Sequence, residues 1–317
     1  GRTWSRPSLV SAPKGTSDKD MVIADRRHPG LVYVAYDNSG FGLVPPPRGA
    51  NKLIVARSTD HGRHWRRTVV AHFPQDRSYA NSQLTILRSG TLVLTAAGPD
   101  KNGDDGIKAW RSTDRGHSWR GPFQVAQLSQ GSFPSFCGKT ARGVGEITSA
   151  MAHVGPRSLA IVINDAAAAA HGGKLLLAES RDGGRSWHSS RILRSSSPLL
   201  LASIAGHPNG RVGVVYDKVN ASGVECGASP KIPTRSLVTT SRNQGRTWSR
   251  SALVGPRWFN MADSLVGSQY FLGDYQNIVA SRGGFTTATV QGRALRGHDA
   301  RGFTGRTGVV VARQLMH

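Results

Sequence analysis

The chain of 317 residues carries 41 lysine and arginine residues against 19 acidic ones, which gives a formal net charge of +22 and a pI near 11.2. This charge favours polyanionic partners such as acidic polysaccharide, nucleic acid or an anionic surface. No apolar stretch reaches the ~20 residues that span a bilayer, so we expect no membrane span. The sequence has two cysteines and no Cys-x-x-Cys or Cys/His cluster, so it indicates neither a metal site nor another cofactor.

Short apolar runs separated by Gly, Pro and Asn turns follow one another along the chain, which is typical of an all-β fold. They group into repeats of four predicted strands. The first two repeats comprise 21–25, 31–36, 52–57 and 65–70, then 83–87, 91–95, 107–111 and 119–125. The next two comprise 147–153, 158–163, 175–179 and 187–193, then 200–205, 212–216, 236–240 and 248–253. A fifth repeat, 275–280, 285–289 and 309–313, lacks its fourth strand.

One phrase, S-x-D-x-G-x-x-W, lies between the third and fourth strands of each complete repeat, with Asn243 in place of Asp in the last copy. An Asp here accepts N–H bonds from the residues that follow it. The Gly supplies a positive φ for a tight turn, and the Trp buries a large apolar surface. We therefore expect structural roles for the members of this phrase: Asp60, Asp114, Asp182, Trp65, Trp119, Trp187 and Trp248.

The phrase resembles the Asp-box, or BNR repeat, of the sialidase-like β-propellers. That resemblance implies a single propeller domain over residues 1–317, secreted and monomeric. The repeats predict five blades, with the six blades usual in the family's enzymes as the alternative. Because residues 1–5 repeat residues 245–249, we expect a strand over 4–10 to complete the last blade. The chain opens inside a motif, so any leader peptide would already be absent.

In a propeller the loops that enter the first strands and leave the second strands meet on one face, the usual place for a ligand. The resemblance implies Tyr275 as nucleophile there and Glu146 as its assisting carboxylate, with Asp37 or, as the alternative, Asp20 as general acid. The substrate-binding candidates in the same loops are Asp20, Arg77, Arg142, Arg235, Arg257 and Asp274. Residues 18–21, where sialidases carry an Arg that binds the substrate carboxylate, contain no Arg. Cys137 and Cys226 also lie in these loops, and we expect a disulfide between them.

Three functions compete for this face. The first is exo-glycosidase action on an acidic extracellular glycan, as the resemblance to sialidases implies. The second is a lyase reaction on a uronic-acid polysaccharide, which needs a base and a cation that neutralises the carboxylate. The third is binding of an anionic glycan or a partner protein without turnover. Nucleic acid is disfavoured because aromatic residues make up 7% of the chain and do not interleave with basic ones.

Overall fold

The computed structural model describes residues 2–11, 16–39, 51–72, 80–99, 105–128, 133–143, 150–155, 157–165, 172–207, 209–255, 258–294 and 305–315. These residues divide into two compact units, which are described one at a time. The first comprises 1–127 with 182–186, and the second comprises 128–181 with 187–317. The prediction of a single domain over 1–317 stays a prediction.

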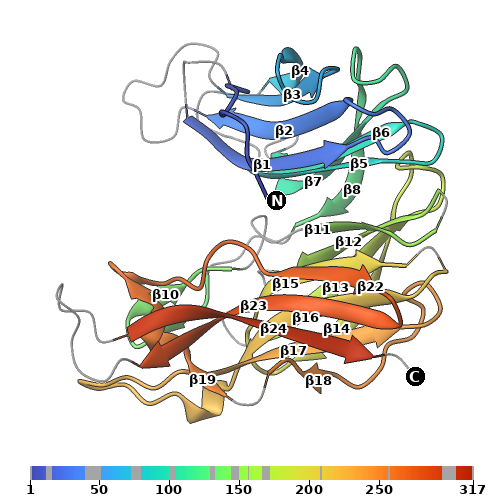
Figure 1. Ribbon diagram of the computed structural model, residues 1–317. Coiled ribbons are helices and arrows are strands. Elements are labelled where there is room, and N and C mark those ends of the chain that lie inside the picture. The colour runs from blue at the N-terminus through green and yellow to red at the C-terminus, as the bar shows by residue number, and fades with distance from the viewer. Residues whose placement is uncertain are drawn as a thin grey trace. The chain divides into compact units, whose positions relative to one another are not determined.

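The first unit contains two four-stranded antiparallel sheets, which confirm the all-β prediction (Figure 1). Apolar side chains of both sheets pack into one core, centred on Tyr33, Leu94 and Trp110. One sheet is β1 (Thr16–Ala24), β2 (Val32–Ser39), β3 (Lys52–Ser58) and β4 (Arg66–His72), and the other is β5 (Ala80–Ile86), β6 (Leu92–Pro99), β7 (Asp105–Ser112) and β8 (Arg120–Gln127).

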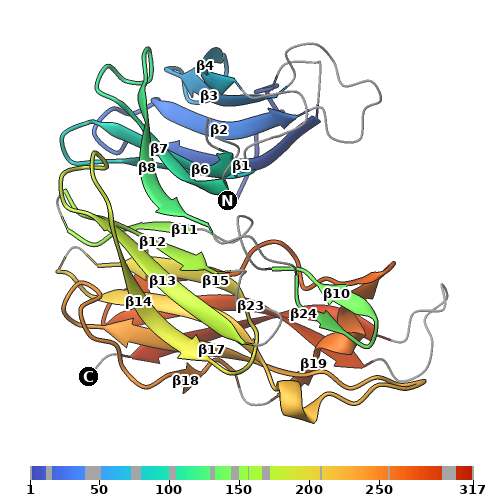
Figure 2. The same ribbon diagram turned by 180° about the vertical axis from the view of Figure 1, so that it is seen from behind.

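The second unit contains two more such sheets and one of three strands (Figure 2). Every residue of β12 is buried, because this strand has a packed layer on both faces. The strands are β11 (Ala150–His153), β12 (Leu159–Asn164), β13 (Gly173–Ser180) and β14 (His188–Ser195), then β15 (Leu199–Gly206), β16 (Val212–Val219), β17 (Pro233–Ser241) and β18 (Ala252–Leu253), then β22 (Asn277–Ser281), β23 (Gly284–Ala294) and β24 (Gly305–Leu315). A short strand, β19 (Phe259–Asn260), also pairs with β17.

A small sheet that the sequence did not predict is built from connecting segments of the second unit. It has the order β20 (Leu265–Val266), β21 (Gln269–Tyr270), β10 (Lys139–Ala141) and β9 (Ser135–Phe136), and β10 runs parallel to β21. An apolar cluster that includes Phe136, Tyr270 and Leu272 packs beside it. Two 3-10 helices, η3 (Ala221–Gly223) and η4 (Met261–Ser264), lie in the same connecting segments.

The repeated phrase folds as its residue types require. In the second copy Ser118 N–H donates to Asp114 Oδ1 at 3.0 Å, and Gly116 N–H donates to Ser112 Oγ at 2.8 Å. Arg115 and Gly116 both have positive φ, 58° and 83°, as in the tight turns that suit twisted hairpins. In the fourth copy Asn243 Oδ1 takes the same bond, from Thr247 N–H at 2.9 Å.

The N-terminal stretch differs from its prediction. Residues 2–11 form no strand, and Trp4 is 89% exposed where a phrase Trp would be half-buried. Hydrogen bonds hold this stretch against the first sheet: Trp65 Nε1 donates to Ser8 Oγ at 3.1 Å, and Arg67 Nε donates to the Val10 carbonyl at 2.7 Å. The predicted fourth strand over 4–10 is therefore not formed, and β24 pairs with β23 alone in the described chain.

Candidate functional site

Three sheets share an irregularity at the start of their first strand. Each of these strands contains a β-bulge, and each bulge carries a non-glycine residue with positive φ: Lys19 at 53°, Asn81 at 58° and Leu201 at 51°. A left-handed conformation costs a residue with a Cβ of order 1–3 kcal/mol, and such residues concentrate at functional sites. A bulge also re-aims the neighbouring side chains. The bulges therefore mark the strand starts as candidate sites.

Asp37 lies opposite the bulge in the first unit. It pairs with Asp18 in the β1–β2 register and is 5% exposed. Burial is the main cause that raises its pKa, to about 7, and the charge of Asp18 adds to the effect. Its Oδ1 atom has no hydrogen-bond partner within the described structure. A carboxyl group in this state carries a proton near neutral pH and can donate it.

The predicted residues of the second unit gather ahead of β22. Arg142 Nε lies 3.1 Å from Asp274 Oδ1, and the Arg142 guanidinium carbon lies 5.2 Å from the centre of the Phe271 ring. The backbone N–H of Arg142 also donates to the Tyr270 carbonyl at 3.1 Å. These contacts hold the segment that leads to Tyr275, which is 53% exposed. An exposed phenol on a held segment is accessible to a ligand.

The residue directly after Tyr275 belongs to a buried polar pair. Gln276 Nε2 donates to Asp217 Oδ2, and Asp217 is fully buried near the end of β16. Burial raises the pKa of Asp217 to about 7, although hydrogen bonds from Ser236 and Gln276 oppose the shift. Asp217 directly follows the predicted strand over 212–216, but nothing in the sequence pairs it with Gln276. The pair ties the residue after Tyr275 to the neighbouring sheet.

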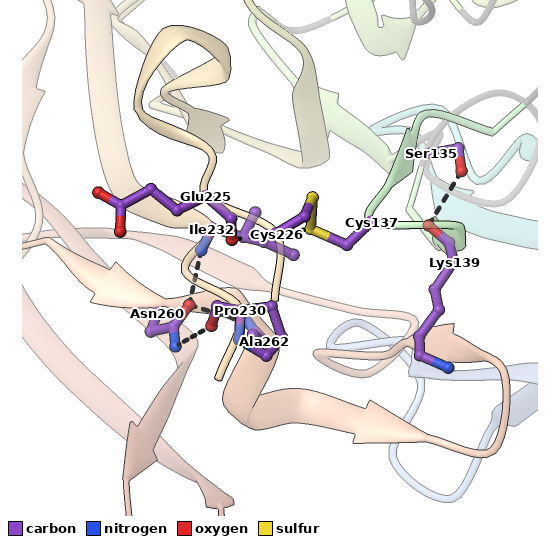
Figure 3. Close-up of a disulfide and its surroundings, with 9 residues drawn as sticks. All are labelled: Ser135, Cys137, Lys139, Glu225, Cys226, Pro230, Ile232, Asn260 and Ala262. Atoms are coloured by element: carbon purple, nitrogen blue, oxygen red, sulfur yellow. Dashed lines mark hydrogen bonds between the residues drawn. A yellow bond between two sulfur atoms is a disulfide. The ribbon is translucent and has the colours of Figure 1, made fainter. Parts of the chain in front are cut away.

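Cys137 and Cys226 form a disulfide across 89 residues of sequence (Figure 3). It joins the β9–β10 hairpin to the connection between β16 and β17. Asn260 holds the same connection from a third segment: its side chain accepts from Ile232 N–H at 2.7 Å and donates to the Pro230 carbonyl at 3.1 Å (Figure 3). Closing a loop of this length contributes on the order of 4 kcal/mol in the chain-entropy model. The connecting segments of the second unit thus form one cross-linked layer.

The remaining predicted site residues are dispersed. Glu146, Arg77 and Arg257 lie outside the described residues. Asp20 is exposed in the first unit, on the same bulge as Lys19. Arg235 lies near the start of β17 and packs on Trp258, a residue that no sequence pattern singles out.

In the described ranges, no three His, Cys, Asp or Glu side chains are grouped closely enough to hold a metal ion. No helix in those ranges is long and apolar enough to cross a membrane.

No protein-family model and no curated protein matches the chain. Solved structures do match it. A protein of unknown function from Dyadobacter fermentans aligns over 98% of this chain and 85% of its own, at 14% identity and a TM-score of 0.58. A Hadza microbial sialidase aligns over 99% of this chain but 57% of its own, at 17% identity and a TM-score of 0.50. The GH93 α-L-arabinofuranosidase of Fusarium graminearum, solved with arabinobiose, aligns over 93% and 92%, at 14% identity and a TM-score of 0.51.

A polysaccharide lyase of family PL25, an ulvan lyase, is also among the similar structures, at 9% identity. These matches show the fold: four-stranded antiparallel sheets of the β-propeller type. The similar structures include several carbohydrate-active enzymes, both hydrolases and a lyase.

Proposed function

We propose that the protein is an extracellular glycoside hydrolase that cleaves a terminal residue from an acidic glycan. The observation that carries this proposal is Asp37, a buried carboxyl group with a pKa of about 7. A general acid works best when its pKa is near the working pH, because it is then both protonated and a good enough acid. An ordinary surface aspartate is ionised at neutral pH and has no proton to give.

Tyr275 is assigned the role of nucleophile. Its oxygen would attack the anomeric carbon while its phenolic proton passes to the Glu146 carboxylate. The role of general acid, which protonates the departing glycosidic oxygen, is assigned to Asp37. Water would then cleave the bond between sugar and tyrosine: its hydroxyl joins the sugar, its proton restores the general acid, and the proton held by Glu146 returns to the phenolate. The exposure of Tyr275 supports this role, as does the contact between Arg142 and Asp274 that holds its segment.

The acidic substrate and the extracellular location have separate support. A net charge of +22 attracts anionic polymers and raises their local concentration. A disulfide persists in oxidising compartments and is rare in the cytosol.

The test is a product assay on sialosides, uronic-acid polymers and sulfated chains, read for new reducing ends and for ultraviolet absorbance from an unsaturated uronate. We expect reducing ends without absorbance. Asp37→Asn should lower kcat by a factor of about 10² to 10⁴, the usual range for a lost general acid. Tyr275→Phe should abolish turnover and leave the protein folded.

Asp165→Asn is the matched control. Asp165 directly follows β12, at the strand end that corresponds to Asp37, but it pairs with Lys174 at 2.9 Å. This variant should keep its turnover. Products that absorb in the ultraviolet would show a lyase and contradict the hydrolase proposal. Retention of glycan without any product would show a binding module.

A further inference from the structure

Trp258 differs from the other six tryptophans of the chain. Five of them belong to the repeated phrase or to its N-terminal copy, and Trp110 is buried in the core of the first unit. Trp258 belongs to neither group and is 45% exposed. Exposing a large apolar ring in this way costs free energy unless something covers it. The ring is therefore available to a ligand.

Arg235 is held against this ring by the strand register. Thr234 pairs with Phe259 in the antiparallel β17–β19 ladder, so Arg235 and Trp258 follow as neighbours across the two strands. The Arg235 guanidinium carbon lies 4.4 Å from the centre of the Trp258 ring. Stacking of this kind uses the face of the guanidinium and leaves its N–H donors in the plane. The cation is therefore oriented before any ligand arrives.

Arg235 has no counterion in the described part of the chain. Within the described ranges no acidic side chain forms an ion pair with it, and its Nε–H has no acceptor. Arg142, whose guanidinium also lies on an aromatic ring, is paired with Asp274. A half-buried guanidinium without a counterion favours an anion strongly, because partial burial weakens the screening by water.

The two residues lie at an outer edge of their sheet. The strand order is β15, β16, β17 and β18, and β19 also pairs with β17. Trp258 directly precedes β19, so it lies at the edge of the sheet opposite to β15. Both views show β18 and β19 along one margin of the second unit (Figures 1 and 2). Tyr275 and Asp274 precede β22, which belongs to another sheet. The pair therefore belongs to a different sheet from the strand that follows the proposed nucleophile.

We propose that Arg235 and Trp258 form a peripheral subsite for an acidic sugar residue. The indole accommodates the apolar face of the sugar ring, and the guanidinium binds its carboxylate or sulfate. The choice of an acidic glycan as ligand rests on the proposed function, but the binding itself requires no turnover. Such a subsite holds a long anionic chain on the protein while its end is processed elsewhere.

The test is calorimetric titration of the whole protein with uronic-acid oligomers, sulfated oligomers, neutral oligomers of the same length and a single-stranded oligonucleotide. Trp258→Ala should weaken binding of the acidic oligomers at least tenfold. Arg235→Lys keeps the charge but not the planar stack and should weaken it several-fold, and Arg235→Gln should weaken it more. Preference between the uronic and sulfated oligomers identifies the acidic group.

Arg250→Gln is the matched control, because it removes the same charge from an exposed position just before β18. It should change affinity less than twofold. Equal losses for Arg235→Gln and Arg250→Gln would reduce the effect to general charge and overturn the subsite. An unchanged affinity in a folded Trp258→Ala variant, or tighter binding of the oligonucleotide than of any oligomer, would overturn it as well.

The two proposals fail in different ways. If the subsite is real, Trp258→Ala should turn over a short substrate at the rate of the unaltered protein and lose rate only on long chains. If the unaltered protein turns over no glycan at all, the hydrolase proposal fails, while the titrations still decide the subsite. If Trp258→Ala slows the short substrate as much as the long chain, the subsite is not peripheral.

Discussion

Asp37 links the proposed chemistry to stability through one carboxyl group. Its pKa rises from 3.8 to about 7 when the chain folds. The folded chain therefore binds more protons than the unfolded chain between these values, and stability decreases as pH rises through that range. The stabilising effect of the proton is complete below pH 3.8 and is lost at about pH 7. Above pH 7 a buried charge remains, with a cost on the order of 4 kcal/mol.

We therefore predict that Asp37→Asn is more stable than the unaltered protein at pH 8, and that this advantage largely disappears at pH 4. The amide cannot ionise, so the cost of the buried charge is absent. Urea unfolding at both pH values measures this difference directly. Asp165→Asn, which removes a carboxylate paired with Lys174, should show no gain at pH 8. A gain in stability that accompanies lost turnover would identify Asp37 as a residue retained for function.

In the turn of the fourth copy of the phrase, the amide of Asn243 takes the place of the Asp carboxylate. Asn243 keeps the Oδ1 bond from Thr247 N–H, and its Nδ2 donates to Thr247 Oγ1 at 2.9 Å. In the second copy the corresponding hydrogen bond runs in the opposite direction, because the hydroxyl is the donor: Ser118 Oγ donates to Asp114 Oδ2. Hydroxyl groups serve as either donor or acceptor, so the same turn accommodates both residues.

We predict that Asp114→Ala lowers the free energy of unfolding by about 1–2 kcal/mol, because three N–H or O–H donors, from Ser112 and Ser118, lose their acceptor. Asp114→Asn should cost less than half as much. Thermal or urea unfolding of the two variants gives the comparison. Equal losses would mean that the carboxylate charge, and not the hydrogen-bond geometry, stabilises the turn.

At the scale of the elements, only part of the structure could be predicted from the sequence. Phrase and strand positions follow from local residue types, so the four-stranded repeats were predictable. The sheet of β9, β10, β20 and β21 was not, because strands of two or three residues carry no periodicity. The position of Asp37 was predictable at a strand end, but its raised pKa depends first on its burial and then on the charge of Asp18 opposite it, and both are set by the folded structure. The contact between Arg235 and Trp258 depends on a register that no local pattern encodes.

At the scale of the whole molecule, the charge of +22 predicts a binding mode that salt weakens. Most basic side chains in the described ranges are exposed, and around exposed charges the screening length is about 10 Å at 0.1 M salt. We predict that affinity for a long acidic glycan falls at least tenfold between 50 and 300 mM NaCl. Titrations at several salt concentrations measure the slope. Affinity for a single acidic sugar should fall less, because a half-buried guanidinium is screened less. Salt-independent binding of the long glycan would exclude a charge-driven partner.

The turns of the phrase also receive contacts from neighbouring segments. Thr68 Oγ1 donates to the Gly116 carbonyl at 3.1 Å, Arg111 Nε donates to the Gly183 carbonyl at 2.7 Å, and Tyr33 OH donates to the Arg115 carbonyl at 3.3 Å. Three unrelated side chains serve as donors, but the acceptor is always the main chain. No point mutation deletes a carbonyl group, so these joints can survive long divergence while the donors change. Main-chain acceptors of this kind suit a fold that the chain shares with solved structures at only 14% identity.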